Sequence, residues 1–358
     1  MRAASRVSAA SFAALLLAGA LAAQAKVVPA VEKRARALVN QLELAERRVA
    51  AAEELQALGA AGVPALAARL NDPRPEVVQV VCEVLCALGP AAAAALPQLV
   101  TVAGSPDVAI ARMVRLTECR VRTTGTTTIC EFGGGRIVQV AADGTERVLI
   151  ESVDCLDFDE LPDGHLLVTH YNGGRVTEYD AQGKEVWSFA KLSMPGEADR
   201  LLDGRTLIAD THGGRVIEVD PKGEVVWEWK TPGKRPFDVE RLANGRTLVA
   251  MYPDHLVEID RAGEVVWKFE NPGGLFRADR LPDGNTLVSL HDAGLVREVN
   301  PKGETVWEAK VTQPNDADRL PNGNTLVGTA TSVIELGPDG KVVSENQRGK
   351  RVTEVARH

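Results

Sequence analysis

The stretch DADRLPNGNTLV, residues 316–327, repeats almost letter for letter the phrase ADRLPDGNTLV at 278–288. Related phrases stand at 159–168, 199–208 and 240–249, and a diverged copy, RVRTTGTTTI, stands at 120–129. Tryptophans keep the same spacing, since Trp187, Trp227, Trp267 and Trp307 are each 40 residues apart. The sequence therefore contains six copies of one unit of about 40 residues.

Each copy predicts four strands. In the fifth copy the strands are ADRL, NTLVSL, LVREVN and ETVWEA, joined by turns such as Pro-Asp-Gly and Asn-Pro-Lys-Gly. In such turns proline fixes φ and glycine supplies a positive φ. Six four-stranded units predict a six-bladed β-propeller, a closed ring that leaves few exposed sheet edges. The closure stays open: the tail GKRVTEVARH (349–358) could complete a blade, although the first copy also shows an inner strand of its own.

Residues that recur in most copies are expected to pack the blades together. Each tryptophan is predicted to lie between two blades, against a turn of the neighbouring unit. The arginines of the repeated Asp-Arg pairs are expected to pair across strands with a recurrent glutamate, because burial would otherwise leave both charges unpaired. These glutamates are Glu178, Glu218, Glu258, Glu298 and Glu335.

The N-terminus has the pattern of a cleaved secretory leader. Arg2 and Arg6 precede the apolar run AASFAALLLAGALAA, and the small residues Ala23 and Ala25 predict cleavage after Ala25. The run is shorter than the roughly 20 residues of a membrane-spanning helix, and no later span is expected. The domains expected are a signal peptide (1–25), a helical segment (26–114) and the propeller (115–358), in a secreted or periplasmic protein.

The segment 26–114 is rich in alanine and leucine with helical spacing. ALGAAGVPALAARL (57–70) is echoed by ALGPAAAAALPQLV (87–100), and PEVVQVVCEVLCALG between them has an apolar stripe. Short paired helices of this kind resemble HEAT repeats. A plain helical bundle is the alternative.

Charge and cysteine content narrow the choice of partners. The net charge of −8 argues against nucleic acid as a partner. Five cysteines show neither a CxxC pair nor zinc-ligand spacing. Cys82 and Cys86 are expected to be free thiols on a helix. Cys119 and Cys130 flank a turn-like stretch, so a disulfide between them is one of two open readings.

Two sets of residues are candidates for a binding site. The loops between second and third strands, which vary between copies, hold His170, His212, His255, His291, Asp210, Asp254 and Asp292. They could contact an anion or a metal, or simply stabilise their own loops. The starts of the innermost strands hold Asp157, Glu197, Asp238 and Asp316, four carboxylates that could bind Ca²⁺ near the axis or line a solvated channel. At the equivalent position, Arg277 is a candidate for an anion contact.

Two families share these repeats. DPKGEVVWEW (220–229) and NPKGETVWEA (300–309) resemble the tryptophan-docking pattern of PQQ-type quinoprotein propellers, and RLPDGNTLV with GEVVW resembles arylsulfotransferase-like propellers. The resemblance covers about residues 118–344 and implies a propeller fold. Quinoproteins of that type have eight blades and often a vicinal cysteine pair, so PQQ is not expected here. Arylsulfotransferases use a histidine nucleophile, whereas the inner strands here carry Asp or Glu.

The sequence favours an exported propeller that binds a small ligand or a protein partner without catalysis. The alternatives are an enzyme with its site in the funnel, either sulfotransferase-like or a metal-dependent hydrolase or lyase, and a PQQ-type cofactor binder. The oligomeric state is left open.

Overall fold

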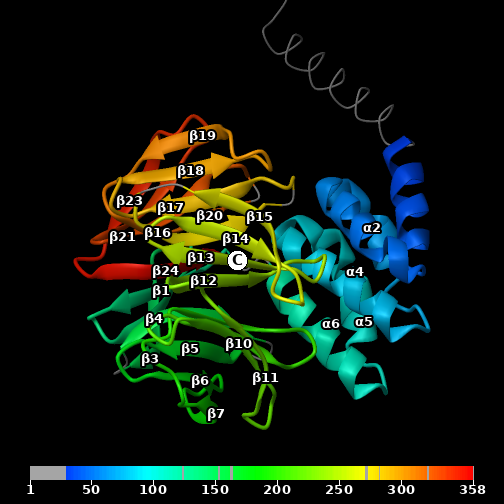
Figure 1. Cartoon of the computed structure of the whole chain (residues 1–358), viewed down its shortest axis with the longest axis horizontal. Coiled ribbons are helices and arrows are strands. Elements are labelled where there is room, and N and C mark those ends of the chain that lie inside the picture. Colours follow the sequence, from blue (N-terminus) through cyan, green and yellow to red (C-terminus); the bar gives the residue numbers. More distant parts are fainter. Residues whose placement is uncertain are drawn as a thin grey trace, which may run out of the picture.

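The computed structural model describes residues 30–122, 125–151, 154–161, 164–270, 273–281, 283–320 and 322–357. The expected signal peptide, with its cleavage after Ala25, lies outside the described residues. The described strands form six sheets of four strands each. The helices gather on one side of this ring (Figure 1). The expected six-bladed propeller is confirmed.

Five of the six blades run outward from the axis in chain order. The second blade is β4 (Cys155–Glu160), β5 (Leu166–His170), β6 (Arg175–Tyr179) and β7 (Glu185–Phe189). The third is β8 (Glu197–Arg200), β9 (Thr206–Asp210), β10 (Arg215–Val219) and β11 (Val225–Lys230). The fourth is β12 (Arg235–Arg241), β13 (Thr247–Tyr252), β14 (His255–Ile259) and β15 (Val265–Glu270). The fifth is β16 (Leu275–Arg280), β17 (Thr286–Leu290), β18 (Leu295–Val299) and β19 (Thr305–Lys310). The sixth is β20 (Pro314–Arg319), β21 (Thr325–Thr329), β22 (Ser332–Leu336) and β23 (Val342–Gln347).

The first blade is built from both ends of the propeller sequence. Its order is β24 (Arg351–Arg357), β1 (Thr127–Phe132), β2 (Arg136–Val140) and β3 (Glu146–Glu151). The C-terminal β24 is the innermost strand and pairs antiparallel with β1, with Thr127 opposite Arg357. The tail therefore completes the ring, and the inner strand expected in the first copy is wrong. Residues up to Val121 belong instead to helix α6 (Val108–Val121).

The helical segment precedes the propeller and packs on it. Its elements are a helix at 30–41, α2 (Ala45–Ala57), η1 (Gly59–Gly62), α3 (Val63–Ala67), α4 (Pro75–Leu88), η2 (Gly89–Ala95), α5 (Leu96–Val102) and α6. Asp107 caps α6 by accepting hydrogen bonds from the backbone of Ala109 and Ile110. The helix then runs past the expected boundary at residue 114, because its apolar side continues to Val121, which is fully buried. One apolar core joins these helices to Leu161, Leu202 and Ala243 of the propeller.

One helical stretch, Pro75–Val102, is long and apolar enough to cross a membrane by length and composition. No such stretch is expected from the sequence after the leader. In this structure 44% of its most apolar window is buried against neighbouring helices. A core helix of a folded domain passes the same test, so this one stretch is weak evidence for a membrane span.

The contacts between blades follow the repeat. Trp227 Nε1 donates to the carbonyl oxygen of Arg261, in a turn of the next blade, at 3.1 Å. Arg280 pairs with Glu258 at 3.2 Å, and its guanidinium lies over the ring of Trp267 at 5.1 Å. Both expectations for the recurring residues are confirmed. The five arginine–glutamate pairs are Arg200–Glu178, Arg241–Glu218, Arg280–Glu258, Arg319–Glu298 and Arg357–Glu335.

One of the two expectations for the cysteines is confirmed and the other is wrong. Cys82 and Cys86 are free thiols on α4, as expected. Cys130 is also a free thiol, buried in β1, so the disulfide between Cys119 and Cys130 is wrong. The two residues do not flank a hairpin, because Cys119 lies on helix α6.

Candidate functional site

The two faces of the propeller differ in what they carry. We call the face with the short glycine turns the turn face; it holds turns such as 242–246 and 300–303. The opposite face, with the loops between second and third strands of each blade, is the loop face. The helices pack on the turn face, where Asn244 Nδ2 donates to Glu53 Oε1 at 2.9 Å. The loop face is therefore the side turned away from the helices.

Arg277 lies on the propeller axis, buried among carboxylates of four other blades. Its guanidinium nitrogens are 3.0 Å from an oxygen of Asp157 and 3.2 Å from one of Asp238. Glu197 lies at 3.2 Å and Glu354 at 3.1 Å. The structure thus brings together the axial residues singled out in the sequence, and adds Glu354 from the closing strand. Arg277 contacts anions, but these are side chains of its own chain.

The axial acids also satisfy the backbone of the innermost strands. An inner strand has no neighbour on its axial edge, so its N–H groups need other acceptors. Asp238 accepts a hydrogen bond from the backbone of Ala278 at 2.8 Å, and Asp316 accepts one from Val355 at 3.0 Å. Each acid therefore joins its own blade to the next.

Burial strongly perturbs this cluster. Desolvation raises the pKa of Asp157 to about 6, although the nearby charge of Arg277 opposes it. Desolvation and the neighbouring acids raise the pKa of Glu197, Asp316 and Glu354 well above their usual range. Desolvation lowers the pKa of Arg277, but the surrounding carboxylates outweigh it and hold that pKa far above normal.

The axis leaves little room for a cofactor. Between Arg277 and the loop face there is a cavity of about 20 Å³, lined by residues that include Phe237 and Phe276. Ligand pockets are typically about 300–1,000 Å³, so this channel does not fit PQQ. The described residues include no group of three or more His, Cys, Asp or Glu side chains arranged to hold a metal ion. Calcium binding by the axial carboxylates stays a prediction.

A β-bulge turns one residue of the inner strand toward the loop face in most blades. In β12 the register shifts between Pro236 and Asp238, which leaves Phe237 unpaired, and in β16 the same shift leaves Phe276 unpaired. Bulges re-aim side chains in this way at barrel rims. The third blade has Gly196 nearby, where a Cβ would come within 2.2 Å of the carbonyl oxygen of Phe237. Glycine there lets the neighbouring bulge approach.

The two bulge residues Phe237 and Phe276 form the centre of an aromatic mouth around the axis on the loop face. Phe237 and Phe276 stack with ring centroids 5.0 Å apart, and His291 stacks on Phe276 at 4.7 Å. We call this group the aromatic mouth; its members are Phe132, Tyr171, His212, Phe237, Tyr252, Phe276 and His291. The chain has seven phenylalanines and three tyrosines, and half of these ten rings lie here.

Arginine accompanies the rings. The guanidinium of Arg351 lies over Phe276 at 5.7 Å, and its Nη2 donates to Asn315 Oδ1 at 2.8 Å. Burial lowers the pKa of Arg351. Among the described residues no carboxylate pairs with Arg351 or with the exposed Arg235. The mouth therefore combines apolar rings with cations that lack a counter-charge.

The loop residues proposed from the sequence separate into two groups. His212 and His291 belong to the aromatic mouth, and Asp292 accepts a hydrogen bond from Tyr252 Oη at 3.1 Å. Burial lowers the pKa of His291, whose Nδ1 is buried without a partner among the described residues.

The other four stabilise their own loops. His170 is 1% exposed and bonds Tyr179 Oη at 3.2 Å. Asp210 accepts hydrogen bonds from the backbone of Ser193 and from Arg215. Asp254 pairs with His255 and with Lys234.

Sequence reasoning missed the rings themselves. Tyr171 directly follows the second strand of its blade, and Tyr252 is the last residue of the second strand of its own blade, next to the loops that hold the histidines. Phe237 and Phe276 directly precede the axial residues. Two features of the sequence could have indicated them. Phenylalanine and tyrosine are scarce in this chain, and those outside the repeated positions lie at equivalent points of several copies.

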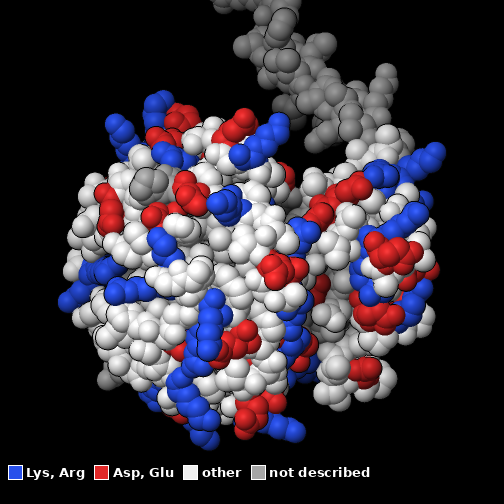
Figure 2. Space-filling model, in the orientation of Figure 1, with Lys and Arg blue, Asp and Glu red and all other residues white. Residues whose placement is uncertain are grey.

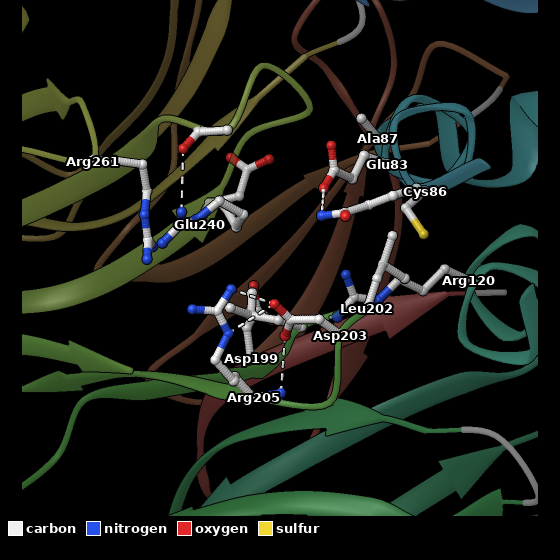
Figure 3. Close-up of a pocket in the computed structure, with 14 residues that line it drawn as sticks. Glu83, Cys86, Ala87, Arg120, Asp199, Leu202, Asp203, Arg205, Glu240 and Arg261 are labelled. Atoms are coloured by element: carbon white, nitrogen blue, oxygen red, sulfur yellow. Dashed lines mark hydrogen bonds and ion pairs between the residues drawn. The ribbon is translucent and has the colours of Figure 1, made fainter. Parts of the chain in front are cut away.

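A second hollow lies where the helices meet the turn face. It is a pocket of about 290 Å³ between α4 and the inner turns of the third and fourth blades. Glu83 and Cys86 of α4 line one side, and Asp199 and Arg205 line the other (Figure 3). Burial raises the pKa of Glu83 to about 7 and that of Asp199 to about 8. Burial at this junction therefore favours the protonated form of one acid on the helix and of one acid on the turn face.

The molecular surface shows mixed charge. Lysines and arginines are interspersed with aspartates and glutamates over the visible face (Figure 2). That face has no broad basic field of the kind that binds a phosphate backbone.

The geometry defines a class: a six-bladed propeller with a filled axis and an aromatic mouth on its free face. Residues 163–356 match the PQQ_2 family model, described as outer membrane protein assembly factor BamB. The chain therefore belongs to this family. No curated protein matches the chain in sequence.

Solved structures share the fold. A protein of unknown function from Bacteroides caccae aligns over 64% of this chain and 97% of its own, with 19% identity and a TM-score of 0.55. A catalytically inactive virginiamycin B lyase from Staphylococcus aureus, solved with quinupristin, aligns over 63% and 81%, with 13% identity and a TM-score of 0.50. At such identities the likeness concerns the fold alone.

Proposed function

We propose that this chain is an exported, non-catalytic interaction module that holds a protein partner at the aromatic mouth. The observation that carries the proposal is the gathering of half of the chain's phenylalanine and tyrosine rings on the face turned away from the helices. Aromatic residues and arginine are the residue types enriched in the cores of protein interfaces. The family's description as an assembly factor supports a role in binding other proteins.

The filled axis supports binding rather than catalysis in a funnel. Arg277 and its carboxylates occupy the space that a substrate would need in order to enter, and the cavity above them is about 20 Å³. A shallow, rigid, aromatic surface suits a protein segment. The leader-like N-terminus supports export, and the helices, which resemble HEAT repeats in sequence, would offer a second surface. The resemblance to arylsulfotransferase-like propellers concerns the repeated sequence only, and it does not support sulfotransferase activity.

Site-specific photo-crosslinking tests the proposal. A photoreactive phenylalanine analogue is placed at Tyr171 on the loop face and, as the control, at Lys222 on the turn face, in cells that make and export the protein. We expect one or a few discrete protein adducts from position 171 only, and we expect their loss when Phe276→Ser is added. Identical adducts from both positions, or adducts insensitive to Phe276→Ser, would contradict the proposal.

A further inference from the structure

The seam between the first and second blades departs from the other seams. In the second to fifth blades the strand register sets a tryptophan opposite a glutamate, as Trp227 opposite Glu218, and an arginine of the next blade completes the contact. At this seam Arg147 lies opposite Gln139, in the place of the tryptophan and glutamate. Glu160 lies where the other inner strands carry arginine. All three contact residues are therefore replaced.

A groove opens where the tryptophan is missing. Its volume is about 410 Å³, and the side chains of Leu149, Leu161 and Leu166 give it apolar walls. Helix α6 adds Arg115 and Arg122 to its lining. The remaining polar lining residues are Glu118, Gln139, Arg147, Glu160 and His165.

The cations of this groove are incompletely paired. Arg122 pairs with Glu118 on the same helix, and Glu160 accepts a hydrogen bond from Thr128. Arg115 donates to the carbonyl oxygen of Ala103 at 3.3 Å. Neither Arg115 nor Arg147 forms an ion pair with any residue that the structure describes. Among its described lining residues the groove thus holds three arginines against two glutamates, in a chain whose net charge is −8.

We propose that this groove binds a small organic anion with a flat apolar body. The body would lie against Leu149 and Leu161, in the space that an indole ring fills at other seams. The anionic group, a carboxylate or phosphate, would lie between Arg115 and Arg147, because guanidinium groups bind both in a bidentate manner. The helical segment would then serve a purpose beyond covering the turn face, since α6 supplies half of the anion contact.

The seam between the sixth and first blades provides an internal comparison. There Ser344 stands opposite Glu335, again without tryptophan, and a groove of about 490 Å³ opens. The pair between Arg357 and Glu335 is retained at that seam, however. A groove therefore opens at both seams that lack the tryptophan. Only the first is lined by a helix arginine, Arg115, that forms no ion pair with a described residue.

Calorimetric titration with indole-3-acetate tests the proposal, with indole and inorganic phosphate as separate probes of the two halves of the ligand. Arg147→Trp refills the groove, and Ser344→Trp refills the comparison groove as the matched control. We expect indole-3-acetate to bind the wild type and Ser344→Trp equally, and Arg147→Trp not at all. Indole and phosphate should each bind more weakly than indole-3-acetate.

Arg115→Ala, at an exposed helix position, keeps the test valid if Arg147→Trp fails to fold. It should weaken binding on the order of tenfold, the usual effect of losing a hydrogen bond to a charged group. Equal affinity in Arg147→Trp and the wild type, or no binding of indole-3-acetate to the wild type, would overturn the proposal. Equal binding of indole and indole-3-acetate would overturn the assignment of an anion.

Discussion

At the scale of single residues, the interior of the propeller depends on one guanidinium. Arg277 lies between 3.0 and 3.2 Å from carboxylates of four blades. Each carboxylate alone would be expensive to bury, and together they would repel one another. The arginine offsets that repulsion while its planar group contacts several acids at once.

Arg277→Met should destabilise the protein by about 3 kcal/mol, because it leaves buried carboxylates without a counter-charge. The measurement is urea unfolding followed by circular dichroism. Arg351→Met is the matched control, since Arg351 pairs with no carboxylate among the described residues, and it should change stability by less than about 1 kcal/mol. Adding Asp157→Asn and Glu197→Gln to Arg277→Met should restore part of the loss; no recovery would show that the charge is not the cause.

Individual side-chain contacts could be predicted from the sequence only at positions that recur in successive blades. The pairing of Arg280 with Glu258 could be predicted because the same spacing recurs in successive blades and a buried charge needs a partner. The aromatic mouth could not be predicted, because Phe237 and Phe276 reach it through β-bulges, which shift the register by one residue without a clear sequence mark. The axial positions of Arg277 and of three of the carboxylates around it were predictable, whereas the fourth, Glu354, needed the closing strand.

At the scale of elements, α4 packs against the turn face, and its own Glu83 lies in the pocket between them. Burial raises the pKa of Glu83 from 4.5 to about 7, and the groups that act on it across the pocket are Arg241 and Asp203. The folded protein therefore keeps a proton on Glu83 that the unfolded chain releases. This contribution to stability is complete below about pH 4.5 and is lost as pH rises through about 7.

Glu83→Gln should therefore stabilise the protein at pH 8, on the order of 2 kcal/mol, and change little at pH 5. Chemical unfolding at both pH values measures the difference. Glu264→Gln, on an exposed turn, is the control and should have no pH-dependent effect. The same stability change at pH 5 and pH 8 for Glu83→Gln would argue that the glutamate is not protonated in the folded protein.

At the scale of the whole molecule, the ring is closed by hydrogen bonds between its most distant segments. The strand β24 completes the first blade, supplies Glu354 to the axis and pairs Arg357 with Glu335 of the sixth blade. The sequence alone left this closure open for two reasons. The C-terminal tail lacks the repeated phrase, and the residues just before β1 resemble a diverged copy of it. These residues do not form an inner strand, because those up to Val121 belong to helix α6, which Asp107 caps.

Ending the chain after Gln347 should abolish the cooperative unfolding transition, because β1 loses its inner partner and the axis loses a carboxylate. Thermal unfolding and amide hydrogen exchange measure this, with loss of protection expected first in β1 and β20. A synthetic peptide of residues 348–358 should restore the transition when added back. A truncated protein that melts like the full chain would show that the closing strand is dispensable.

Because β24 is the last strand in the sequence, the first blade can be completed only after all other blades have been synthesised. Every other blade strand leaves the ribosome before β24 does, so a nascent chain carries five complete sheets and one unfinished sheet until β24 has been made. Contacts between residues more than 200 positions apart form slowly, since loop closure precedes any gain from pairing. The open β1 edge is then a template for wrong pairing. The arrival of β24 would therefore decide when the ring becomes resistant to proteases and to misassembly, and the same would hold during the export proposed above.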